Sequence, residues 1–273
     1  MKLLKYSLLF VLFLLIVIGA GSFVLENVAL RETRSFDAIK FQELEFTMEE
    51  LTLFCDVVFT SENTRVRKWT TDIKVEIKNK ADLDEKYIAE VDSIIAIFAP
   101  LIAPLKIERV EGDGNLHVYR KVTCISGPRN GKRWYLNGLA RINKRTTYSW
   151  DINFACVYDS YNGTSQTLIH EFQHALGLDH PINLYPFYVT IGRSVIPQYF
   201  KSKEETQAYL NEPFYLSNQE KKVITMLYSS EVKPGLHIDL FTQRMGLSKS
   251  DVQRMLPNKN KPKSVIIYPV DKK

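Results

Sequence analysis

Three of the chain's five histidines lie within the eleven residues from His170 to His180, and their spacing suits metal binding. In a helix, His170 and His174 project from one face, where two imidazoles can reach a single ion. Gly177 predicts the end of that helix, because glycine adopts the positive φ of a helix C-terminus without a Cβ penalty. The backbone can then turn back and bring His180 to the same ion.

The chemistry expected of this trio is hydrolytic. Three neutral imidazoles leave one tetrahedral position of Zn²⁺ for water, which is the arrangement of a catalytic zinc site. Glu171 follows His170 on the edge of the same helical face. It could accept the proton of that water while the ion lowers the pKa of the water toward about 7. The pattern therefore predicts a hydroxide-like nucleophile that attacks a carbonyl group polarised by zinc.

Two simpler interpretations stay open at this point. A pair of histidines around a glutamate can be a coincidence on the surface of an amphipathic helix. A zinc site can also bind its metal without turning over a substrate, and the chain would then be a binding module for a peptide or a cell-envelope partner.

The stretch from His170 to His180 resembles the zinc-binding signature of the metzincin metallopeptidases, His-Glu-x-x-His-x-x-Gly-x-x-His. Among the metzincins, its sequence is most similar to the signature of the matrixins. This resemblance implies Zn²⁺ ligands at His170, His174 and His180, a general base at Glu171, and a protein or peptide substrate. It also implies an α+β fold, with a mixed sheet, an active-site helix and a mostly helical C-terminal part.

The elements before the motif follow the order of that family, in which a strand, a helix and further strands lead to the metal-binding helix. Residue spacing predicts a helix at 82–99, and alternation predicts strands at 69–77, 105–110, 115–121, 134–142 and 152–158. By the resemblance, residues 136–141 could be an edge strand that pairs with an extended peptide; a plain sheet strand is the alternative. His117 is expected to be a sheet residue and not a ligand.

Met226 and Tyr228 are candidate supporting residues. Metzincins have a methionine turn beneath the metal, and in some of them a tyrosine two residues later approaches the metal. However, residues 217–220 form a capping box followed by an apolar stripe at helical spacing, so Met226 equally fits a core helix. The segment 181–215 is long enough to form a wall of the substrate cleft.

The N-terminus predicts export. Lys2 and Lys5 precede an uncharged, largely apolar run over residues 7–25, which is just long enough to span a bilayer. A cleaved signal peptide and a retained membrane anchor both fit. In either case the positive charges stay on the cytoplasmic side, so the rest of the chain is expected outside the cytoplasm.

The 45% hydrophobic content is typical of a globular protein, and the net charge of +5 indicates no particular partner. The expected organisation is a signal peptide or anchor at 1–25, a stalk or N-terminal arm at 26–62, a zinc metallopeptidase domain at 63–232, and a helical extension with a basic tail at 233–273. Residues 240–256 have the spacing of a DNA-reading helix-turn-helix. We expect no nucleic-acid partner, because an exported chain meets no chromosome; a DNA-binding membrane regulator would need a cytoplasmic tail.

Cysteine usage gives a further expectation. Cys124 and Cys156 are predicted to pair in an oxidising compartment, which leaves Cys55 single. Matrixin-like enzymes are held latent by a propeptide cysteine, but the sequence around Cys55 does not resemble that switch. A buried thiol on an apolar helix face is therefore expected at Cys55.

Overall fold

A mixed sheet and a set of helices make up the described part of the chain, in agreement with the predicted α+β class. The computed structural model describes residues 11, 17, 35–59, 64–78, 84–125, 135–144, 150–161, 163–181, 183, 185, 189–192, 215–248 and 251. None of the helices within these residues is long and apolar enough to cross a membrane. The predicted targeting run at 7–25, most of the segment 181–215 and the second half of 240–256 lie outside the described residues.

The main sheet has six strands, of which β7 alone runs antiparallel to its neighbour. The strand order is β1-β8-β4-β2-β3, and β7 pairs with β8. A separate antiparallel pair is formed by β5 and β6. The bounds are Lys68–Trp69 (β1), Ile73–Ile77 (β2), Ile107–Arg109 (β3), Leu116–Val122 (β4), Cys124–Ile125 (β5), Tyr135–Leu136 (β6), Gly138–Lys144 (β7) and Asp151–Ser160 (β8).

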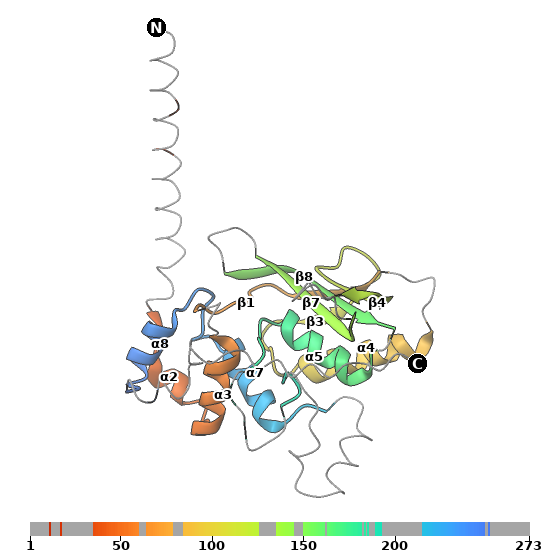
Figure 1. Ribbon diagram of the computed structural model, residues 1–273. Coiled ribbons are helices and arrows are strands. Elements are labelled where there is room, and N and C mark those ends of the chain that lie inside the picture. Colours follow the sequence, from red (N-terminus) through yellow and green to blue (C-terminus); the bar gives the residue numbers. More distant parts are fainter. Residues whose placement is uncertain are drawn as a thin grey trace, which may run out of the picture.

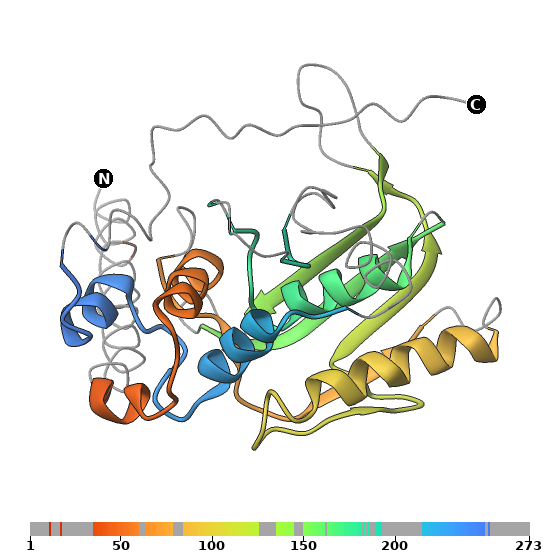
Figure 2. The same ribbon diagram turned by 90° about the horizontal axis from the view of Figure 1, so that it is seen from below.

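Two helices, α4 (Glu85–Phe98) and α5 (Ser165–Ala175), lie against one face of the sheet, as Figure 1 and Figure 2 show. They meet through Phe98 and Phe172, whose rings stack with centroids 6.3 Å apart. Both rings are fully buried. Apolar packing against the sheet and against α4 therefore fixes α5, the predicted metal-binding helix.

A second group of helices packs at one end of the sheet (Figure 1). Phe241 is buried among aromatic rings from the N-terminal region, including Phe41 and Phe54, with centroids 5.5 Å away in both cases. The described parts of the predicted arm (26–62) and extension (233–273) thus belong to the same hydrophobic core as the sheet. The helices are α2 (Ala38–Gln42), α3 (Met48–Val58), α7 (Asn218–Tyr228) and α8 (Ile238–Arg244).

The first predicted strand, 69–77, is divided in the structure. Its start belongs to β1, which pairs with β8, and its end is β2, which pairs with β3 and β4. Asp72 lies in the break, where its carboxylate accepts the Lys106 amide N–H at 2.9 Å and its carbonyl accepts the Asn115 side-chain amide at 2.9 Å. These two hydrogen bonds fix the backbone at Asp72, between the end of β1 and the start of β2.

The predicted disulfide is wrong, because Cys124 and Cys156 are both free and buried. The Sγ atom of Cys124 lies 3.9 Å from the carbonyl oxygen of Tyr158. Tyr158 is two residues beyond Cys156 along β8, a distance of roughly 6.6 Å along a strand. The two thiols are therefore out of register. Cys55 is buried in α3 as expected, and burial raises the pKa of its thiol.

Candidate metal centre

Helix α5 carries the motif and ends where the glycine predicts. Thr164 caps its N-terminus by accepting the Thr167 amide N–H at 3.2 Å, and the last helical residue is Ala175. Gly177 has a φ of 103°, and a Cβ atom at this position would lie 2.2 Å from the carbonyl oxygen of Arg67. Both the backbone conformation and the available space therefore require glycine.

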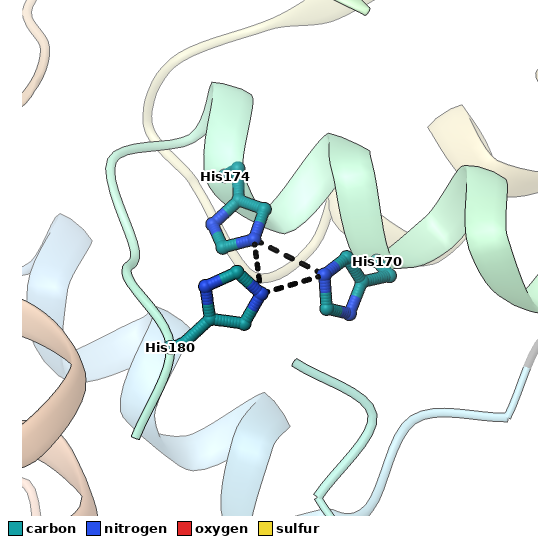
Figure 3. Close-up of side chains that lie close together, drawn as sticks. All are labelled: His170, His174 and His180. Atoms are coloured by element: carbon teal, nitrogen blue, oxygen red, sulfur yellow. Dashed lines mark hydrogen bonds between the residues drawn. The ribbon is translucent and has the colours of Figure 1, made fainter. Parts of the chain in front are cut away.

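The structure brings the three predicted histidines together (Figure 3). The Nε2 atoms are 3.1 Å apart for His170 and His174, 3.2 Å for His174 and His180, and 3.2 Å for His170 and His180. Nitrogens about 2.0–2.1 Å from a tetrahedral ion such as zinc lie about 3.3 Å from one another. The trio thus has the size and donor set to hold a metal ion.

Hydrogen bonds on the opposite side of the rings set the direction of the lone pairs. The Nδ1 atom of His170 lies 2.8 Å from the Thr190 carbonyl oxygen, and that of His174 lies 2.8 Å from the Leu178 carbonyl oxygen. A carbonyl oxygen only accepts, so each Nδ1 carries the proton and each Nε2 of these neutral rings presents a lone pair. Lone pairs that face each other at 3.1 Å repel, and a cation between them removes that repulsion.

The electrostatics of His170 agree with a ligand role. Burial, reinforced by the neighbouring His174, lowers the pKa of His170 to about 3. The ring is therefore neutral at physiological pH, as a metal-binding imidazole must be. His117, by contrast, lies apart from the trio as a sheet residue, with Nε2 3.0 Å from the Gly114 carbonyl oxygen and 3.6 Å from the Glu76 carboxylate.

The side chain of Glu171 extends from α5 toward strand β7. It is 6% exposed, and its carboxylate accepts the amide N–H of Ala140. Gly138 makes this contact possible, since a Cβ atom there would approach Glu171 Oε1 to 2.8 Å. Burial raises the pKa of Glu171 to about 8, against the opposing effect of the Ala140 bond. A carboxyl group with a pKa near neutrality is suited to both accepting and returning a proton.

Met226 and Tyr228 do not have the positions that a methionine turn implies. Met226 lies inside α7 and is fully buried, so the core-helix interpretation holds. The Tyr228 hydroxyl donates to the Leu176 carbonyl oxygen at 2.9 Å, and Trp69 donates to the Ala175 carbonyl oxygen at 2.8 Å. These bonds satisfy carbonyl groups that the end of α5 leaves without helical partners. In this structure Tyr228 thus supports the end of the metal-binding helix.

The segment around His180 is held by α3. The amide N–H of Asp179 donates to the Val57 carbonyl oxygen at 2.7 Å. The buried carboxylate of Asp56 accepts the Asn183 amide N–H and the Tyr185 hydroxyl, each at 2.9 Å. This role was missed from the sequence, although a charged residue within the apolar run of α3 signals a buried polar contact.

No family model matches the chain, and no curated protein matches its sequence. The histidine trio, Glu171 and the elements that hold them are therefore the features that indicate a function.

Proposed function

We propose that the chain is an exported zinc-dependent peptidase of metzincin type, which hydrolyses peptide bonds at the centre formed by His170, His174 and His180. The observation that carries the proposal is the convergence of three Nε2 atoms at 3.1–3.2 Å, with the buried Glu171 directly after His170 in the same helix. The three imidazole donors support zinc as the metal, because zinc binds such ligands tetrahedrally and leaves one position for water. The apolar run at 7–25 supports export as a secreted or membrane-anchored protein.

Bound zinc would supply a Lewis acid for the substrate carbonyl and lower the pKa of bound water toward about 7. Glu171 then accepts a proton from the attacking water and returns it to the nitrogen of the leaving amine. The Ala140 N–H holds the carboxylate in place against β7. The hydrogen bonds to Thr190 and Leu178 keep the first two imidazoles in the tautomer that binds metal.

Strand β7 provides a place for the peptide. Among the described strands it pairs with β8 alone, so its other edge is free of a strand partner within that part of the chain. An extended peptide can add to such an edge through main-chain hydrogen bonds. Because Glu171 accepts the Ala140 N–H, a peptide that adds along the rest of β7 would pass close to the general base.

The test compares full-length protein with a Glu171→Gln variant, both loaded with Zn²⁺, on casein and on a peptide library. Removing a general base lowers the rate by about 10²–10⁴-fold, so we expect hydrolysis by the wild type and a loss of that size in the variant, with equal zinc content. Equal hydrolysis by both proteins would remove Glu171 from the mechanism. Stoichiometric zinc without any hydrolysis would instead favour the binding module.

A further inference from the structure

Glu220 is a buried carboxylate with two different hydrogen-bonding tasks. It is 2% exposed and lies in the first turn of α7. Its Oε2 atom accepts the Ser217 amide N–H at 3.1 Å and the Ser217 hydroxyl at 2.9 Å, which completes a capping box. Its Oε1 atom accepts the amide N–H of Ile191 at 3.0 Å. One oxygen thus caps the helix, and the other holds a distant loop.

The Ile191 N–H belongs to the same peptide group as the Thr190 carbonyl. A trans peptide is planar, and its N–H and C=O point in opposite directions. The Thr190 carbonyl oxygen accepts the Nδ1–H of His170 at 2.8 Å. Glu220, this peptide group and His170 therefore form a continuous chain of hydrogen bonds that ends at a metal-binding nitrogen.

The 190–191 peptide is fixed on its other sides as well. Thr190 donates its hydroxyl to the Tyr215 carbonyl oxygen at 2.9 Å. The Gly192 amide N–H donates to the Val189 carbonyl oxygen at 2.9 Å, which closes a turn around the peptide. Thr190 and Ile191 are both buried. The peptide group thus has one defined orientation, with its oxygen directed at His170.

We propose that Glu220 is a positioning residue for the metal centre, acting on His170 through the Thr190–Ile191 peptide group. The two oxygens of the Glu220 carboxylate accept N–H and O–H groups, and the bond to Ile191 fixes the direction of the peptide dipole and polarises it, so that the Thr190 oxygen becomes a stronger acceptor for the Nδ1 proton. A stronger bond at Nδ1 keeps the Nε2 lone pair directed at the ion and raises its basicity. This inference rests on the proposed zinc centre.

A second capping box in the chain separates this role from ordinary helix capping. In α3, Glu50 Oε2 accepts the Thr47 amide N–H at 2.7 Å and lies 3.1 Å from the Thr47 hydroxyl. This box has the same spacing and the same glutamate as the one in α7, with a threonine hydroxyl in place of the serine hydroxyl. Its bonds stay within the first turn of the helix, on a partly exposed surface. Glu50 is therefore a matched control for the capping function alone.

The experiment measures the zinc dissociation constant of full-length protein by competition with a chromophoric chelator. Glu220→Gln keeps the size of the side chain but removes the charge and one acceptor, and we expect about tenfold weaker zinc binding, within the range for outer-shell partners. Ser217→Ala and Glu50→Gln disturb helix caps and leave the Ile191 bond intact. For these two variants we expect an unchanged zinc affinity, although Ser217→Ala lowers the melting temperature.

Each outcome separates the alternatives. Equal weakening by Ser217→Ala and Glu220→Gln would overturn the inference, because Glu220 would then act only through the helix cap. Unchanged affinity in Glu220→Gln would overturn it as well, while the zinc centre of the wild type stands. A wild-type protein that takes up no zinc would overturn the proposed function together with the inference. If Glu220→Gln fails to fold, Glu220→Asp keeps the charge, withdraws the carboxylate from Ile191 and is expected to weaken zinc binding likewise.

Discussion

The three histidines are held in place by two different parts of the molecule. His174 is supported within the motif itself, by the Leu178 carbonyl four residues later. His170 and the segment around His180 depend on remote helices, through Glu220 of α7 and Asp56 of α3. Helices α3 and α7 pack against each other. The motif therefore supplies the donor atoms, whereas helices α3 and α7, which lie outside it, fix the positions of two of the three histidines.

The largest effect is expected from breaking the local support. Gly177→Ala places a Cβ atom 2.2 Å from the Arg67 carbonyl oxygen at a residue with a φ of 103°. We expect the free energy of unfolding to fall by about 2–4 kcal/mol and zinc binding to be lost. Urea denaturation and metal analysis measure the two quantities.

Gly246→Ala is the control for this variant. Gly246 has a φ of 68°, but a Cβ atom there would meet nothing within 4 Å. Only the conformational strain remains, so a loss of about 1 kcal/mol is expected, with zinc binding retained. Equal losses in the two variants would contradict the role assigned to the close contact with Arg67.

Breaking the remote support is expected to have the next largest effect. Asp56→Ala leaves the half-buried Asn183 N–H and the buried Tyr185 hydroxyl without the carboxylate that now accepts them. We expect the free energy of unfolding to fall by about 2–3 kcal/mol and zinc to dissociate faster. Asp37→Ala removes an exposed helix cap with two similar bonds, costs about 1 kcal/mol and leaves zinc dissociation unchanged. Equal zinc kinetics in both variants would argue against α3 as a support of the metal centre.

The end of α7 gives a pH-dependent test. Lys68 is buried and donates to the carbonyl oxygens of Leu227 and Ser229 at 3.0 and 3.1 Å. Burial, with a smaller effect of Lys233, lowers the pKa of Lys68 to about 7, whereas an unfolded lysine has a pKa of about 10.4. Between these values the unfolded chain binds more protons, so this group makes the protein more stable as the pH rises from about 7 to about 10.

Lys68→Met should remove that contribution. The difference in free energy of unfolding between wild type and variant is expected to grow in favour of the wild type across this pH range, as measured by urea denaturation at several pH values. Parallel stability curves would show that Lys68 is not desolvated in solution.

The smallest effect is expected inside the motif. Gln173 is fully buried in α5, and neither of its side-chain amide atoms has a hydrogen-bond partner among the described residues. Gln173→Met keeps the volume and removes the unsatisfied polar atoms, so the free energy of unfolding should rise by about 1 kcal/mol without a change in zinc affinity. A loss of stability would show that the amide group is bonded in the folded protein.

The sequence predicted the parts of the fold that local patterns encode. Apolar spacing located α4 and α5, Gly177 marked the end of α5, and the histidine spacing identified the trio. The Ser217–Glu220 capping box correctly indicated a helix. In each case the deciding physical feature lies within about one helical turn or one strand of the residues concerned.

The contacts that complete the site were not predictable in this way. Asp56 and Asn183 are 127 residues apart, and Glu220 and Ile191 are 29 apart, so no periodicity or cap connects them. The expected pairing of Cys124 with Cys156 was wrong for a related reason. It required the register of strands β4, β5 and β8, which only the assembled sheet determines.

The metal centre is tested most directly by the zinc content of purified full-length protein after dialysis against a weak chelator. We predict one zinc ion per wild-type chain, almost none in His174→Ala, and one in His117→Ala, which removes a histidine of the sheet. A wild-type chain without zinc, or an equal loss in the two variants, would contradict the metal centre.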